Sequence, residues 1–127
     1  PEHQWKQYTR NLIPGGLHSN LAYNQHDVRS RTEGSLQYGG VGVLLLGQDS
    51  SSCDLRGQDE TGLGRWCWTR LRCSDGKGIR FVSAYRPNPP GSGESTVWAQ
   101  HRTYLASRGD ATDPRAVFLR DLKKSIR

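Results

Sequence analysis

The sequence predicts a layered domain of the α/β class, in which mostly antiparallel strands are followed by two covering helices. Residues 65–86 contain two runs of strand character on either side of "SDGKG", a sequence that is typical of a hairpin turn. From residue 95 onward the apolar residues recur at a period of 3.6 instead of two, which predicts helices. Strands followed by helices that can cover them indicate layers of sheet and helix around one core.

The first half of the chain predicts one helix and a set of short strands. Apolar residues at helical spacing indicate a helix over the first dozen residues, and "PGG" at 14–16 ends it: Trp5, Tyr8, Leu12 and Ile13. A short strand is expected within residues 17–27, and a polar loop over 28–37. Residues 39–46 form an apolar run bounded by glycines and predict a buried strand. Residues 50–64 are expected to be loop, with one strand around 53–56.

The hairpin in the middle of the chain has two distinct faces. Alternation along its first strand separates two sets of side chains: Trp66, Trp68, Arg70 and Arg72 on one face, and Cys67, Thr69, Leu71 and Cys73 on the other. Asp75 and Gly76 supply the positive φ that a tight turn needs, so residues 79–86 return as the second strand.

Two helices are predicted after a Pro/Gly-rich loop. The first places four residues on one face and ends near Gly109: Val97, His101, Tyr104 and Leu105. The second begins with Asp113 as N-cap and Pro114 at its first position. Its apolar stripe is expected to contain Phe118, Leu119, Leu122 and Ile126.

The length of 127 residues indicates one domain or a piece of one, and the absence of Met leads us to expect that the chain begins inside a longer reading frame.

Cys67 and Cys73 are about 20 Å apart if they share a strand, which is too far for a disulfide. No C-x-x-C or H-E-x-x-H spacing supports zinc. No apolar run approaches the roughly 18 residues of a membrane span. We expect an intracellular protein with reduced cysteines, and we leave a nuclear location open.

The net charge of +6 is unevenly distributed. Residues 64–86 carry six basic side chains against one acid, whereas residues 48–63 carry four acids against one arginine. A basic face beside an acidic loop suits a polyanionic partner, and nucleic acid above all, with DNA favoured over RNA. The alternative is that these charges are ordinary solvated strand faces.

The second hairpin strand ends in "AYRPN", and this end is the candidate site. Tyr85 and Asn88 can donate hydrogen bonds to a phosphate, and Arg86 can add positive charge. The alternative is that Tyr85 caps the core and that "RPNPPGSG" is a connector. The glycines of "GGVGV" precede a strand and no helix follows directly, so they do not match a nucleotide-binding loop.

The order of motifs over about residues 37–127 resembles the endonuclease/exonuclease/phosphatase superfamily, whose fold is that of DNase I. The matching segments are "YGGVGVLL", an acidic loop, "GLGRWCWTRLRC", "IRFVSAYRPN" and a following helix. Together with "TVWAQHRTYL" and "DPRAVFLRDL", they resemble the endonuclease-like domains of reverse-transcriptase-type mobile elements.

This resemblance implies a portion of a four-layer α/β sandwich with two facing sheets, and a Mg²⁺-assisted hydrolysis of phosphodiester bonds. Tyr85 inherits the role of the family tyrosine that hydrogen-bonds the scissile phosphate, and Asn88 inherits an assisting role. Arg86 and Arg65, the latter from the "GR" motif, are expected to bind substrate. Glu2 is the one acidic residue near the place of the family's metal-binding glutamate.

The sequence also departs from the family, because a "GDxN" motif and a late Asp-His pair do not occur in these 127 residues. We therefore expect a partial domain with an incomplete catalytic set. Two alternatives stay open: a non-catalytic remnant that binds nucleic acid or protein, and a lipid or inositol phosphatase of the same fold.

Overall fold

The structure is a computed structural model, and it describes residues 17–26, 39–88 and 96–127. Its elements follow in the order β1 (Leu17–Ala22), β2 (Val41–Leu46), the 3-10 helix η2 (Gly47–Ser52), β3 (Cys53–Gln58), β4 (Trp66–Arg72), β5 (Gly78–Ala84), α2 (Val97–Ser107) and α3 (Pro114–Ser125). The predicted N-terminal helix and the polar loop at 28–37 lie outside the described residues.

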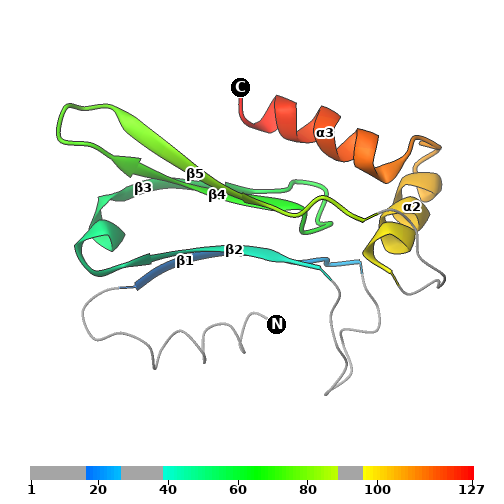
Figure 1. Cartoon of the computed structure of the whole chain (residues 1–127), viewed down its shortest axis with the longest axis horizontal. Coiled ribbons are helices and arrows are strands. Elements are labelled where there is room, and N and C mark those ends of the chain that lie inside the picture. The colour runs from blue at the N-terminus through cyan, green and yellow to red at the C-terminus, as the bar shows by residue number, and fades with distance from the viewer. Residues whose placement is uncertain (1–16, 27–38, 89–95) are drawn as a thin grey trace, which may run out of the picture.

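Two antiparallel sheets face each other (Figure 1). β1 pairs with β2, and β3, β4 and β5 form the second sheet in that order. The side-chain amide of Asn20 joins the sheets, because its nitrogen donates to the carbonyl oxygens of Gly57 at 2.8 Å and Trp68 at 2.9 Å. Cys67 contributes from the opposite sheet, where its thiol donates to the carbonyl oxygen of Asn20 at 3.5 Å. Mixed α/β content with two antiparallel sheets confirms the coarser part of the predicted fold class.

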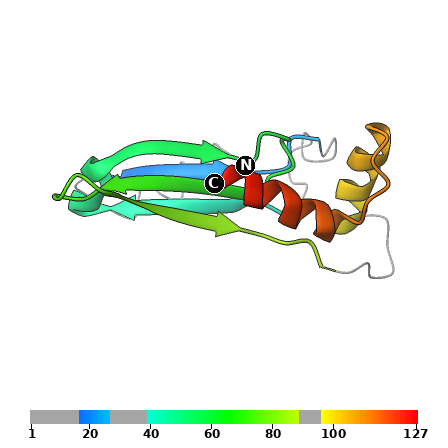
Figure 2. The same cartoon turned by 90° about the horizontal axis from the view of Figure 1, so that it is seen from above.

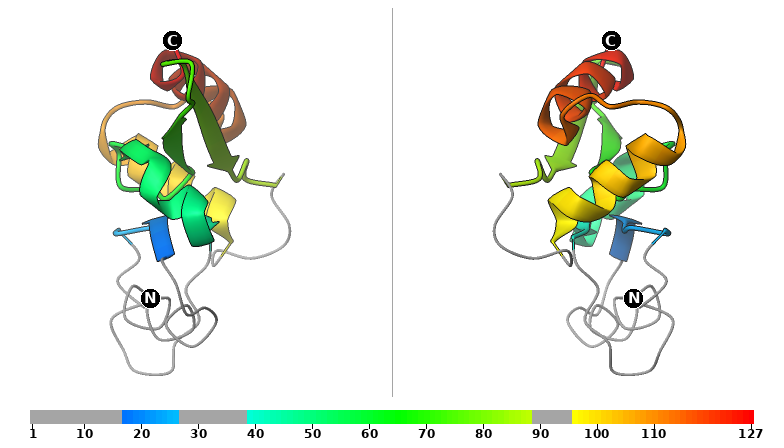
Figure 3. Two further views of the ribbon diagram at one scale, coloured as in Figure 1. Left: turned by 90° about the vertical axis from the view of Figure 1, so that its left-hand side faces the viewer. Right: turned by 90° about the vertical axis from the view of Figure 1, so that its right-hand side faces the viewer.

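The helices cover different parts of the sheets. α3 lies over the outer face of the three-stranded sheet and leaves its hairpin end uncovered (Figures 1 and 2). α2 lies across the opposite end, as Figure 3 shows in the view along the strands. There Gln100 accepts a hydrogen bond from Asn24 at 2.8 Å, and Tyr104 packs on His26 with ring centroids 4.5 Å apart.

The predicted hairpin is confirmed. β4 and β5 pair from Trp66 with Ala84 to Arg72 with Gly78, and Gly76 has the expected positive φ of 79°. The strand predicted around 53–56 extends to Gln58, with an irregular register between Cys53 and Leu55. All three cysteines are free, as expected.

Local signals at the helix ends are also confirmed. The Asp113 carboxylate accepts hydrogen bonds from the backbone N–H groups of Arg115 and Ala116, and Pro114 is the first helical residue. Gly109 follows the last turn of α2 with a φ of 74°.

The predicted apolar stripe of α3 is wrong in part. Phe118 is buried, but Leu119 and Ile126 are 41% and 48% exposed, and Val117 is buried instead. The helix is rotated so that Phe118 packs edge-on against Trp66, with ring centroids 5.9 Å apart. That orientation turns Leu119 towards solvent.

Candidate functional site

Residues 85–88 follow β5 at the end of the sheets where α2 lies (Figure 1). The N–H of Tyr85 donates to the carbonyl oxygen of Arg65 at 2.8 Å, which extends the β4–β5 pairing by one residue. Tyr85 is half-buried, Arg86 and Asn88 are exposed, and Pro87 is buried between them. We call residues 85–88 the rim. Its buried proline anchors the segment while the neighbouring polar side chains remain in contact with solvent.

Strand alternation places Tyr85 on one side of the sheet. Ala84 pairs with Trp66, whose ring packs under α3, and Tyr85 is therefore expected on the opposite side. That side carries Cys67, which contacts β1 and β2. Tyr85 is thus expected on the side of the three-stranded sheet that faces β1 and β2, away from α3.

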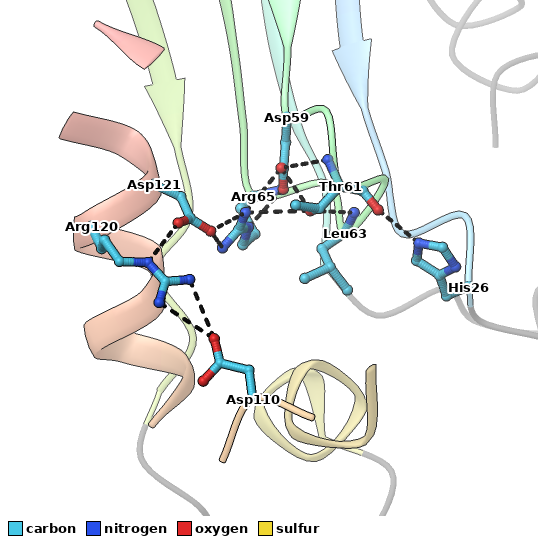
Figure 4. A network of polar contacts seen from close by, with 8 residues as sticks. All are labelled: His26, Asp59, Thr61, Leu63, Arg65, Asp110, Arg120 and Asp121. Carbon is cyan, nitrogen blue, oxygen red and sulfur yellow. Dashed lines mark hydrogen bonds and ion pairs between the residues drawn. The ribbon is translucent and has the colours of Figure 1, made fainter. Parts of the chain in front are cut away.

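Arg65, also predicted to bind substrate, lies inside the protein. Its side chain is 1% exposed, and the Asp59 side chain that it meets is fully buried. Arg65 donates to Asp59 from Nε at 2.7 Å, from a terminal nitrogen at 3.0 Å and from its backbone N–H at 3.2 Å (Figure 4). Thr61 adds two more donors to the same carboxylate, at 2.7 and 3.1 Å.

A second carboxylate completes the environment of Arg65. Asp121 of α3 accepts from both terminal nitrogens of Arg65 at 3.1 Å. Arg120 then bridges Asp121 at 3.0 Å and Asp110, which precedes α3, at 3.3 Å (Figure 4). The charge of Arg65 is therefore compensated within the protein, and direct contact with a substrate would require this network to open.

The pKa of Asp59 shows which influence dominates in this network. Burial by itself raises the pKa of Asp59, but the hydrogen bonds and positive charge of Arg65, together with Thr61, outweigh it and hold the pKa below its usual value. Asp59 is therefore a carboxylate that serves as counter-ion, and it is not a poised acid.

Gly64 allows the segment before Arg65 to pass close to the end of β1. It has a φ of 71°, and a Cβ at this position would lie 2.6 Å from the Cα of Tyr23 and 2.7 Å from the backbone nitrogen of Asn24. Only glycine fits this combination of backbone conformation and close approach. In the "GR" motif, Gly64 thus allows the close approach to β1, and Arg65 forms the buried ion pairs.

His101 of α2 lies buried beside the same network and is 2% exposed. Burial, followed by the positive charge of Arg65, lowers its pKa to about 4. The imidazole is therefore neutral near pH 7. Its position on the buried face of α2 agrees with the helical pattern in the sequence.

The basic residues of the hairpin are compensated to a greater extent than the sequence indicates. Asp54 of β3 accepts from Arg70 at 2.7 and 2.9 Å and lies 3.5 Å from Nε of Arg72. The hydrogen bond from Arg70 is the main cause that lowers the pKa of Asp54 to about 2. Arg80 stacks 4.2 Å above the ring of Trp68. Arg86 in the rim is exposed, and no ion pair is recorded for it among the described residues.

A groove of about 760 Å³ lies between the outer face of the three-stranded sheet and the C-terminal half of α3. Its lining mixes charges of both signs, including Arg56, Glu60 and Lys124, with the ring of Trp68. None of the rim residues lines it. The acidic side chains in this lining offset its positive charge.

No group of three or more His, Cys, Asp or Glu side chains gathers among the described residues. Asp59 and Asp121, the carboxylates close to the rim strand, are both bound by Arg65, which competes for the oxygens that Mg²⁺ would need. Glu2, the predicted ligand, lies outside the described residues.

Comparison of the chain with protein-family models, with curated proteins and with solved structures finds no match. No described helix is long and apolar enough to cross a bilayer. Any function for the rim therefore rests on its own chemistry and on the resemblance of its motifs.

Proposed function

We propose that this chain is the nucleic-acid-binding part of a phosphodiester-hydrolysing domain of the DNase I-like kind, in which the rim contacts a phosphate. One observation carries the proposal. The N–H of Tyr85 is bound to the carbonyl of Arg65, so the "GR" and "YRPN" segments lie side by side at one end of the facing sheets. In this proposal the two sheets and α3 belong to the four-layer sandwich that the motifs imply.

The rim offers the donors that a phosphate needs. Tyr85 supplies a hydroxyl, Asn88 an amide, and Arg86 a guanidinium that can bind two phosphate oxygens at once. Donors aimed at a pentacoordinate phosphorus stabilise the charge that develops in the transition state. In the complete domain, Mg²⁺ would neutralise part of this charge, with ligands other than the carboxylates that Arg65 occupies.

A second function has support from the ion pairs. Asp59 and Asp121 are bound by Arg65, so neither of these carboxylates is free to activate a water molecule. This favours a non-catalytic nucleic-acid-binding module as the alternative. We expect the 127-residue chain to bind DNA without nicking supercoiled plasmid in the presence of Mg²⁺. Nicking that EDTA abolishes would reject the binding-only alternative.

The binding experiment compares two arginines that carry the same charge. Arg86→Ala removes a rim cation, whereas Arg108→Ala removes an exposed cation at the end of α2 that lies 5.0 Å from the ring of Tyr104. In fluorescence anisotropy with a short DNA, affinity should fall steeply between about 50 and 200 mM salt. Arg86→Ala should weaken binding by at least about fivefold and flatten this dependence, while Arg108→Ala should have a smaller effect. Equal effects of the two variants would reject the rim as the binding site.

The catalytic part of the proposal is tested by Tyr85→Phe in the complete domain. Loss of one hydroxyl that binds the transition state should lower turnover at least about tenfold, which corresponds to roughly 1.4 kcal/mol. The melting temperature should barely change, because the ring still packs. Tyr104→Phe in α2 is the matched control. Normal turnover of the Tyr85 variant would reject the catalytic role.

A further inference from the structure

A thiol and an imidazole meet at the end of the sheets opposite the rim. Sγ of Cys53, the first residue of β3, lies 3.2 Å from Nε2 of His18 in β1. The two residues are 35 positions apart in the sequence and belong to different sheets. Both side chains are partly exposed. The contact therefore joins a nucleophile and a base at a place that reagents in solution can reach.

The imidazole of His18 is placed to accept a hydrogen bond from the thiol. Burial, followed by the positive charge of Arg56, lowers the pKa of His18. The imidazole is then neutral near pH 7, and one of its nitrogens is free of hydrogen and can accept from the Cys53 thiol. A thiol activated by an adjacent base is the usual arrangement of a reactive cysteine, since the thiolate is the nucleophile.

The acidic residue next to Cys53 is paired within the protein. Asp54 follows Cys53 directly, but the Asp54 carboxylate is bound by Arg70 and lies 3.5 Å from Arg72. Arg56 lies close enough to influence His18 electrostatically. The local negative charge is therefore compensated, and positive charge remains nearby to attract an anionic reagent.

The other two cysteines lack this arrangement and provide internal controls. Cys67 is fully buried, and its burial raises the pKa of the thiol to about 11. Cys73 is partly exposed, as Cys53 is, but no described imidazole is recorded within hydrogen-bonding distance of it. Among the described residues, Cys73 thus differs from Cys53 in having no imidazole recorded beside it.

We propose that Cys53 is a modification site that exchanges with small-molecule disulfides, with His18 as the base. The Cys53 thiol passes its proton to Nε2 of His18, and its sulfur attacks one sulfur of the small disulfide. The disulfide bond of the reagent breaks, a mixed disulfide forms on Cys53, and the departing thiolate takes up the proton. One disulfide is consumed and one is formed, so no further oxidant is needed.

The proposed modification site is independent of the proposed nucleic-acid function. Cys53 pairs with Leu71, whereas Tyr85 is bound to Arg65. Six residues of an extended strand separate these two points, which corresponds to about 20 Å. Failure of one proposal therefore leaves the other unaffected.

The test uses the purified 127-residue chain with oxidised glutathione at pH 7 and peptide mass spectrometry of all three cysteines. Cys53 should form the mixed disulfide at least about tenfold faster than Cys73, and Cys67 should react only in denaturant. His18→Gln, which keeps a polar side chain without a basic nitrogen, should reduce the rate at Cys53 to that of Cys73. Circular dichroism checks that the variant is folded.

Two results would overturn the proposal. One is equal rates at Cys53 and Cys73 in the unmodified sequence, a comparison that needs no variant. The other is a folded His18→Gln protein in which Cys53 reacts as fast as before.

Discussion

Replacing Asp59 by Asn tests how much of the stability depends on the buried charge network. The change keeps the volume of the side chain but leaves the guanidinium of Arg65, which is 1% exposed, with Asp121 as its remaining counter-ion. Removing one partner of a buried ion pair costs about 3–5 kcal/mol, because a charge is left without compensation in a medium that solvates it poorly. Asp121 retains part of the compensation, so we expect a loss of about 3 kcal/mol.

The loss can be measured by urea unfolding followed through tryptophan fluorescence, because buried Trp66 lies 4.4 Å from the guanidinium carbon of Arg65. Asp110→Asn is the matched control, since it makes the same chemical change in a solvent-exposed pair with Arg120. A natural domain has a total stability of about 5–15 kcal/mol, so the expected loss for Asp59→Asn is a large fraction. If the two variants lose equal stability, the reasoning about Arg65 is wrong.

Two further predictions concern pH and packing. The folded pKa of His101, about 4, lies below its ordinary value of 6.5, so the unfolded chain binds the proton first. Stability should therefore fall as the pH falls from about 6.5 to about 4, and melting curves of His101→Gln should show a weaker dependence over this range. In β3, a Cβ at Gly57 would lie 2.6 Å from the ring of Trp68. Gly57→Ala should therefore cost about 1–3 kcal/mol and change the tryptophan emission, and an unchanged midpoint and spectrum would show that the ring moves freely.

The parts of the fold that could be predicted are those with local signals. Gly76 specifies the hairpin turn through its positive φ, and Asp75 through its carboxylate, which accepts from the N–H of Lys77 at 3.0 Å. Asp113 with Pro114 specifies the start of α3. These signals act over a few residues, so tertiary contacts have little opportunity to override them. The apolar stripe of α3 was harder to predict, because rotation of a helix about its axis is decided by its partner, here Trp66.

The distribution of free charge could not be predicted from the sequence, because the counter-ions are distant along the chain. Arg65 is paired with Asp121, which is 56 residues away, and Arg70 with Asp54, which is 16 residues away. A count of charges in residues 64–86 therefore overestimates the positive surface. One local signal does exist: Asp59 accepts hydrogen bonds from Thr61 two positions later, a pattern typical of an Asx turn, which makes it a structural residue.

Arg65 connects the buried ion pairs to the rim. The ion pairs are therefore expected to affect how the rim is positioned. Its guanidinium is held by Asp59 and Asp121, and its carbonyl oxygen holds the N–H of Tyr85. The variant Asp59→Asn separates charge from geometry, because it makes the protein more positive by one unit. Electrostatics alone would then strengthen binding to DNA. If the network positions the rim, affinity should fall in spite of the added charge. Tighter binding by the folded variant would show that Arg65 stabilises the chain without positioning Tyr85.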